Sequence, residues 1–220
     1  MPFDDPRDFL EYLEERRELV RITEEVDPKF EIGAYIRKTS DQQGPVLLFE
    51  NVKGHDIAAV GGIFASRRRV LMALEAGSDE VYDRFQDGVA NPVPPRLVDT
   101  GPCKDVVLKG DDIDLTRLPI PTYAKEDGGA FITHGVVISK DPETGGKNAS
   151  IYRMQLQGKR RLGLFAVEYQ DFSRQYAKAE AKGNSLEVAV ALGCDPVVML
   201  ATQVVAAYGE DELGIAGGLR

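Results

Sequence analysis

The chain has 220 residues, of which 36 are acidic and 27 are basic, giving a formal net charge of -9. This acidic balance argues against general nucleic-acid binding, where a basic face must meet the phosphates. The longest apolar run, 196–207, is interrupted by Thr202 and Gln203 and is too short to span a bilayer. The acidic opening 1–19 lacks the apolar core of a secretory signal. We therefore expect a cytoplasmic protein without a membrane partner.

The first half of the chain mixes helical and strand-like segments. Apolar residues at helical spacing predict helices at 6–19, 28–42 and 66–89. The last of these segments is expected to contain one or two helices. Short apolar runs predict strands at 18–26, 45–50 and 57–65. The Pro-rich segment 91–105 follows; it has no helical period and is typical of a linker or an extended arm. We expect an α/β domain over residues 1–105.

The second half is rich in strand patterns joined by Gly- and Pro-containing turns. Strands are expected at 105–110, 129–142, 148–158, 160–169 and 185–193. Residues 131–156 are typical of a hairpin. A helix is expected over 173–183, with Gly183 just past its end, and 195–207 is a helix or a buried segment. Overall the sequence predicts an α/β (α+β) fold with a second domain at 106–220.

Residues 148–155, NASIYRMQ, place many polar groups in what looks like a strand. Asn148, Ser150 and Tyr152 share one face of such a strand, and Arg153 lies on the other. An edge strand with solvated side chains would explain this pattern. The density of amide, hydroxyl, phenol and guanidinium groups also suits an anionic ligand, because Arg offers a planar fork and Asn a neutral oxygen.

Common catalytic motifs are missing elsewhere in the sequence. The two histidines, His55 and His134, lie in different halves and lack zinc-site spacing. No GxSxG motif supports a serine hydrolase, and the glycine pairs match neither the dinucleotide-binding nor the P-loop pattern. Cys103 and Cys194 fit a reducing compartment better than a disulfide, and Cys194 is interpreted as a small buried residue in a turn.

Residues 114–156, DLTRLPIPTYAKEDGGAFITHGVVISKDPETGGKNASIYRMQL, closely resemble the signature region of the UbiD family of reversible decarboxylases. The resemblance extends to 3–28, 177–202 and 211–220. It implies decarboxylation of an aromatic or α,β-unsaturated carboxylic acid with prenylated FMN, a divalent metal (usually Mn²⁺) and K⁺. It also implies an N-terminal α/β domain, part of a flavin-reductase-like split β-barrel, and a homo-oligomer or a complex with a second chain.

The resemblance also assigns roles to individual residues. It implies a catalytic Arg153, whose guanidinium binds near the substrate carboxylate. It implies metal ligands at Asn148, Asp171 and Glu212, which also lie at the cofactor. Further cofactor contacts are implied at Ser150, Ile151, Tyr152, Phe165, Ala166, Val167 and Gln170, with Phe165 to Val167 on a strand. Potassium ligands are implied at Ala201, Thr202 and Val204.

Two departures from the family keep alternatives open. Asp171 stands where relatives often place a metal-binding His, and an Asp here can instead cap the helix expected at 173–183. The family's catalytic carboxylates fall beyond Arg220, so we expect activity to need residues beyond this chain. The alternatives are a non-catalytic cofactor-binding subunit or fragment that needs a partner chain, and a split-barrel flavin oxidoreductase.

Overall fold

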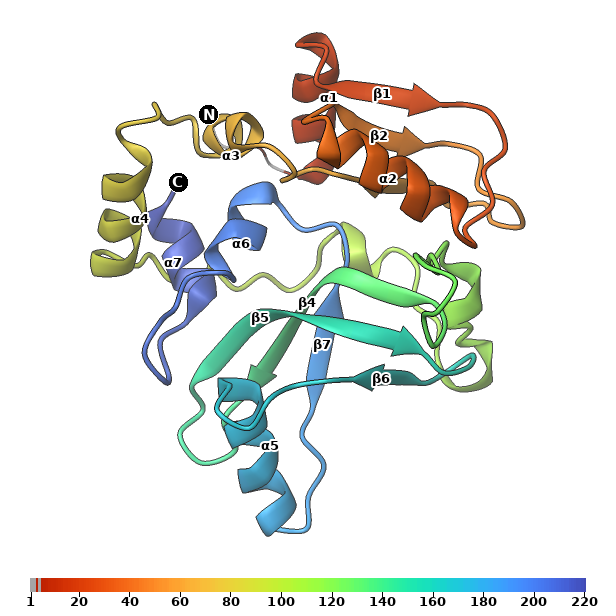
Figure 1. The fold of residues 1–220 in the computed structure, drawn as a ribbon. Coiled ribbons are helices and arrows are strands. Elements are labelled where there is room, and N and C mark those ends of the chain that lie inside the picture. Colours follow the sequence, from red (N-terminus) through yellow and green to blue (C-terminus); the bar gives the residue numbers. More distant parts are fainter. Residues whose placement is uncertain (1–2, 4) are drawn as a thin grey trace.

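The computed structural model describes Phe3 and residues 5–220 as two β-sheets with helices around them (Figure 1). Residues 1, 2 and 4 lie outside the described residues, and of these residue 4 belongs to the UbiD-like opening at 3–28. The helices are α1 (Pro6–Glu15), α2 (Glu31–Asp41), α3 (Arg67–Leu74), α4 (Val81–Ala90), α5 (Asp171–Ala181), α6 (Pro196–Ala201) and α7 (Glu212–Gly218). The strands are β1 (Leu19–Ile22), β2 (Val46–Phe49), β3 (Ala59–Gly61), β4 (Phe131–Lys140), β5 (Lys147–Leu156), β6 (Leu162–Leu164) and β7 (Val188–Ala191). The predicted mixed α/β fold is confirmed.

The first sheet has the strand order β1-β2-β3. β1 is parallel to β2, and β2 is antiparallel to β3. Asp5 caps α1 through its side chain, and the helix buries Phe9 and Leu13 in a cluster with Val46 of β2. The apolar stripe that predicted this helix is therefore the face that covers the sheet.

A charged side chain, Arg69 in α3, is the largest fully buried one among the described residues. Its Nη1 donates to Oε2 of Glu18 at 3.0 Å, and Glu18 is the residue directly before β1. Its other donors meet the backbone carbonyl oxygens of Gly44, Gly62 and Ile63 at 2.9–3.0 Å. A buried cation is tolerated only when it is paired and hydrogen-bonded in this way. The pair therefore ties α3 to one end of every strand of the first sheet.

The second sheet is antiparallel throughout, with the order β6-β5-β4-β7. The predicted hairpin, β4 and β5, forms its centre. Their ladder shifts register between Ile132 and Gly135, where two residues of β4 oppose only Arg153. Such a bulge increases the local twist, and Figure 1 shows the sheet curling into an open half-barrel. The predicted partial barrel is confirmed.

Helices from both halves of the chain share one apolar cluster. Leu74 of α3 packs there with Ile215 of α7, among other buried residues. α7 also approaches α4 closely: a side chain on Gly218 would meet the carbonyl oxygen of Gly88 at 2.7 Å. This core joins elements on either side of the Pro-rich segment 91–105, and the division at residue 105 stays a prediction.

The strand predicted at 105–110 is wrong, and those predicted at 57–65 and 160–169 are much shorter than expected. Residues 105–109 connect the short 3₁₀ turns Pro102–Lys104 and Gly110–Asp112, and Val106 is 77% exposed. Their β-branched residues find no neighbouring strand to pair with among the described residues. The strand expected over 160–169 is limited to β6, because the chain leaves the sheet at Phe165 and turns toward α5.

Both cysteines are free thiols, as the sequence favoured. Cys194 is half-buried beside Met199, and burial raises the pKa of its thiol. Across the described residues, no helix has the length and apolarity needed to cross a membrane.

Replacing Glu18 would leave Arg69 buried without its counter-ion. We expect Glu18→Ala to lower the free energy of unfolding by about 3–5 kcal/mol, as when one partner of a buried pair is removed. Urea denaturation followed by circular dichroism measures this change. Glu14→Ala is the matched control, because Glu14 pairs with Arg21 on the surface and exposed pairs contribute little. Equal losses in the two variants would contradict the role of the buried pair.

Candidate active site

Asn148 lies in the ladder at the start of β5, opposite Ser139 of β4. Only 3% of its surface is exposed, and its Nδ2 atom has no hydrogen-bond partner among the described residues. Ser139 Oγ is buried and unpaired as well. An unpaired buried polar group costs roughly 1–3 kcal/mol. These two atoms therefore mark a place where a bound ligand would offset a cost that the protein alone carries.

Glu212 begins α7 and reaches the sheet. Its side chain is buried, and Oε2 accepts the N–H of Ala149 at 2.8 Å. β6 pairs only with Met154–Leu156 and does not reach Ala149. The carboxylate of Glu212 accepts the N–H of Ala149 where a neighbouring strand would otherwise do so. Burial raises the pKa of Glu212, the N–H of Ala149 opposes that, and the charge of Asp171 raises it further. Among the described residues, Lys147 pairs with Asp211 and Arg174 with Asp171, and no ion pair involves Glu212.

Asp171 is the first residue of α5 and directly follows Gln170, the residue at the N-cap. No side chain caps this helix, so the alternative that Asp171 is a capping residue is wrong. Arg174, one turn later, places its Nη1 3.9 Å from Oδ1 of Asp171. Burial raises the pKa of Asp171, and Arg174 partly opposes this. The role of Asp171 as a metal ligand stays a prediction.

Asn148, Asp171 and Glu212 come from three different elements and all offer oxygen atoms. The two carboxylates disfavour each other's charge, since Asp171 raises the pKa of Glu212. The described residues contain no group of three His, Cys, Asp or Glu side chains that could hold a metal, so the set depends on the amide of Asn148. Mn²⁺ accepts carboxylate and amide oxygens. The buried carboxylate of Glu212 therefore fits a divalent cation, to which Asn148 can offer only its Oδ1 atom, whereas the unpaired Nδ2 is a donor that fits an anion such as a phosphate.

Arg153 is exposed, and its guanidinium lies 5.7 Å from the centre of the Phe131 ring. Tyr152 packs toward α5 on Phe172, so strand alternation directs Arg153 to the opposite face. Asn148 has the parity of Tyr152. It lies in the ladder and not in the turn, and the only register shift of the β4–β5 ladder is on β4, opposite Arg153. The two predicted site residues thus lie on opposite faces of β5.

The three residues between Asn148 and Arg153 that were predicted to line the cofactor differ in their surroundings. Ser150 Oγ donates to Asn148 Oδ1 at 3.5 Å. Ile151 packs on the other face with the cluster around Met199. Tyr152 is 4% exposed, and burial raises the pKa of its phenol. Ser150 is therefore the residue of the three that shares a polar surface with Asn148.

Phe165, Ala166 and Val167 lie on no strand, contrary to the prediction, because β6 ends at Leu164. Phe165 is 70% exposed, whereas Ala166 packs beside the buried cluster that contains Tyr152. The N–H of Val167 donates to Gln170 Oε1 at 2.8 Å. This bond closes the turn into α5 and leaves the amide NH₂ of Gln170 for other partners.

The predicted potassium ligands Ala201, Thr202 and Val204 lie at the end of α6. Thr202 is buried, and its Oγ1 donates to the carbonyl oxygen of Met199 at 2.7 Å. The carbonyl oxygen of Ala201 accepts the N–H of Val204 at 3.0 Å. Each of these oxygens retains a lone pair that can bind a cation, and the potassium site stays a prediction.

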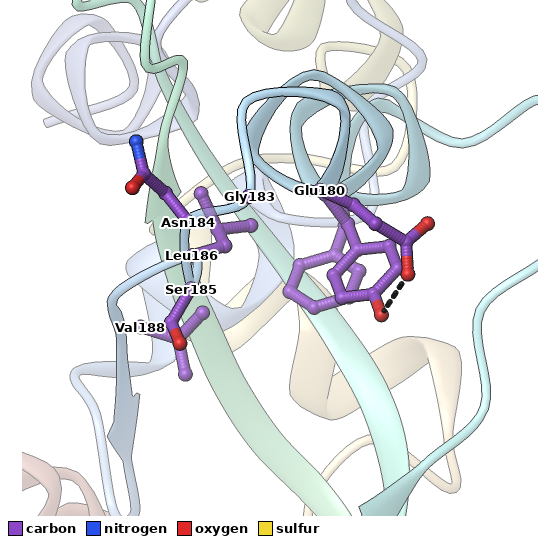
Figure 2. A pocket seen from close by; sticks show the side chains of 8 residues that line it. Glu180, Gly183, Asn184, Ser185, Leu186 and Val188 are labelled. Carbon is purple, nitrogen blue, oxygen red and sulfur yellow. Dashed lines mark hydrogen bonds between the residues drawn. The ribbon is translucent and has the colours of Figure 1, made fainter.

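An open pocket of about 540 Å³ lies between α5 and the loop that leads to β7 (Figure 2). The dashed line in Figure 2 is the bond from the Tyr176 hydroxyl to Glu180, across from Asn184 and Ser185. None of the predicted site residues lines this pocket. It contains no cationic side chain from the described residues, so we assign it no part in binding an acid.

Two family descriptions match the sequence. Residues 96–220 match the UbiD family, described as the 3-octaprenyl-4-hydroxybenzoate carboxy-lyase Rift-related domain, and residues 10–89 match its N-terminal domain. This chain belongs to the UbiD family. An uncharacterized protein of Synechocystis is 34% identical over 90% of this chain and 44% of its own length.

Solved UbiD-class structures have the same fold. An evolved dimeric form of HmfF from Pelotomaculum thermopropionicum, in complex with prFMN, is 37% identical with a TM-score of 0.94; the match covers 99% of this chain and 51% of that one. Vanillic acid decarboxylase of Sedimentibacter hydroxybenzoicus, in its closed form, is 29% identical with a TM-score of 0.94, covering 100% and 49%. The chain spans about half the length of these relatives.

Sequence reasoning missed one buried carboxylate, that of Asp141, which binds side chains from two distant segments. Asp141 is 3% exposed and sits at the turn between β4 and β5. Its Oδ1 accepts the backbone N–H groups of Glu143 and Thr144 at 2.8 and 3.1 Å, as Asp often does in turns. The DPETGG sequence indicated this turn, but no local pattern indicated the distant side chains that Asp141 also binds.

The surroundings of Glu212 predict an unusual response to losing its charge. Glu212→Gln keeps an oxygen for the N–H of Ala149 but buries no charge beside Asp171, so we expect it to stabilise the metal-free protein. Glu212→Leu leaves that N–H unpaired and should lower the free energy of unfolding by roughly 1–3 kcal/mol. Urea denaturation in EDTA measures both. A Gln variant less stable than the parent would mean that the carboxylate is already compensated.

Proposed function

We propose that this chain forms the cofactor-binding half of a UbiD-type reversible decarboxylase that acts on an aromatic or α,β-unsaturated carboxylic acid. The family match and the fold shared with a prFMN-bound relative support this proposal. The observation that carries it is the buried carboxylate of Glu212, which forms no ion pair among the described residues, feels the charge of Asp171 and binds the backbone next to Asn148. A metal-bound phosphate of the cofactor would use all three.

Each residue has a defined task in this proposal. Asn148, Asp171 and Glu212 hold the divalent metal, which offsets the charge of the cofactor phosphate. Arg153 binds the carboxylate of the substrate, for which a guanidinium is suited because it offers paired N–H donors and stays charged. The bound prenylated flavin supplies the electron sink that decarboxylation requires.

A second candidate function is a cofactor-binding subunit that acts only with a partner chain. The free edge of the second sheet favours it. β7 pairs only with β4 among the described strands, and Val188 and Leu192 are 48% and 47% exposed. An exposed apolar strand edge is a surface that proteins usually cover.

Metal retention tests the proposed ligand set. The protein is produced in cells that make prenylated FMN, purified with Mn²⁺ and K⁺, and analysed by native mass spectrometry and metal analysis. We expect the parent to carry flavin and Mn²⁺, and Asp171→Ala to lose the Mn²⁺ because one of three ligands is removed. Tyr176→Phe, in the pocket of Figure 2, is the control that keeps it. Unchanged metal in Asp171→Ala would reject its role.

Arg153→Ala separates binding of the cofactor from binding of the acid. We expect this variant to keep Mn²⁺ and flavin but to lose any release of CO₂ that the parent shows, alone or with a second polypeptide, because the guanidinium of Arg153 is proposed to bind the substrate. Release of CO₂ from the parent chain alone would favour the decarboxylase. Release only after a second polypeptide is added would favour the binding subunit, and reduction of the flavin by a nicotinamide donor would favour an oxidoreductase instead.

A further inference from the structure

The buried carboxylate of Asp141 joins three segments that are distant in the sequence. Besides the turn N–H groups, its Oδ2 accepts a bond from Lys178 Nζ of α5 at 2.7 Å. The same oxygen accepts a hydrogen bond from the hydroxyl of Tyr208, which lies between α6 and α7. Lys178 is 37 residues away and Tyr208 is 67 residues away. Asp141 therefore stabilises the turn and also binds side chains from two distant segments.

Secondary contacts reinforce each link. Lys178 and Lys182 both pair with Glu143 in the turn, at 3.4 and 3.1 Å. The cationic ends of Arg174 and Lys178 lie 5.4 and 5.1 Å from the centre of the Tyr208 ring. These contacts place cations around an aromatic ring whose hydroxyl is already fixed by Asp141.

The turn also packs directly against the segment that carries Tyr208. A side chain on Gly146 would lie 3.6 Å from the Cα atom of Gly209. Next to it, Lys147 Nζ lies 3.7 Å from Asp211 Oδ2. Asp211 in turn caps α7 by accepting the N–H of Leu213. The start of β5 and the start of α7 are thus held together at this end of the sheet.

The three joined segments are the ones that carry the proposed metal ligands. The turn leads into Asn148, Lys178 lies two turns beyond Asp171 on α5, and Tyr208 precedes Glu212 by four residues. We infer that Asp141 is a positioning residue for the metal site, which holds β5, α5 and the segment before α7 so that their oxygen ligands converge. This inference rests on the proposed function.

The charges in the cluster support a permanent link. Hydrogen bonds from Lys178 and Tyr208 hold the pKa of Asp141 well below its usual range, and the Asp141 carboxylate raises the pKa of Lys178. Both groups stay ionised through the neutral range. A carboxylate that also accepts two backbone N–H groups has little freedom to rotate, so it fixes the partners that bind it.

Mn²⁺ affinity of the whole chain, in the presence of excess FMN, tests this inference. The loss of the EPR signal of free Mn²⁺ gives the affinity, and the spectrum of the bound ion reports its ligand geometry. We expect Asp141→Asn to bind Mn²⁺ about tenfold more weakly, as is usual when a group that orients metal ligands is changed. Tyr208→Phe, which removes only the hydroxyl link, should shift affinity and spectrum in the same direction.

Asp114→Asn is the matched control. Asp114 also accepts a backbone N–H and a hydroxyl, both from Thr116, and pairs with Lys159 at 3.0 Å. It caps the 3₁₀ turn Leu115–Arg117, which carries none of the proposed ligands. Its Mn²⁺ affinity and EPR spectrum should equal those of the parent, and circular dichroism checks that every variant is folded.

The outcomes separate this inference from the function on which it rests. If the parent binds no Mn²⁺, the proposed metal site is wrong and the inference fails with it. If the parent binds Mn²⁺ and folded Asp141→Asn and Tyr208→Phe bind it equally well with the same spectrum, the inference alone is overturned. Weaker binding in Asp114→Asn to the same degree would also overturn it, because any surface ion pair would then have the same effect.

Discussion

The antiparallel ladder between β4 and β5 determines where every other part of the second sheet lies. β7 and β6 pair on its two sides. On one face Tyr152 packs against Phe172 at the start of α5, and on the other Ala149 packs with Met199 of α6. Because side chains alternate between faces, a slip of one residue would exchange these contacts and expose the buried ones. The fully buried Val137 and Ala149 thus help to fix the register that also places Asn148.

Two buried acidic side chains show how the same fold treats charge in opposite ways. Glu18 is paired with Arg69, whose other donors are all directed at backbone oxygens, so this charge is satisfied and stabilises the first sheet. Glu212 accepts the N–H of Ala149 but forms no ion pair among the described residues, and Asp171 adds a second negative charge. The same fold thus compensates the carboxylate of Glu18 fully and leaves that of Glu212 without a paired cation. Because a buried charge is normally paired, a bound ligand best explains the unpaired carboxylate of Glu212.

Local patterns in the sequence predicted the elements that are locally determined. The apolar stripe of α1 and the turn between β4 and β5 are examples, since spacing and turn residues specify them without distant partners. Arg69 was not singled out, because a run of three arginines has the appearance of a solvated face and its partner Glu18 is 51 residues away. Residues 105–110 have strand-forming side chains but no neighbouring strand, which no local pattern reveals. The metal ligands were named only through family resemblance; the polar density of 148–155 indicated a site but not which residues face each other.

The position of the candidate site follows from a part of the sheet that is left unpaired. β6 pairs only with the last three residues of β5, so no described strand lies beside the edge of β5 from Asn148 to Arg153. Asn148 and Arg153 lie on opposite faces, and a ligand confined to one face would reach only one of them. A ligand lying along the open edge can contact both, and the carboxylate of Glu212 already occupies one end of that edge through the N–H of Ala149. A ligand that uses both Asn148 and Arg153 would have to lie along this edge, which the short length of β6 leaves open among the described residues.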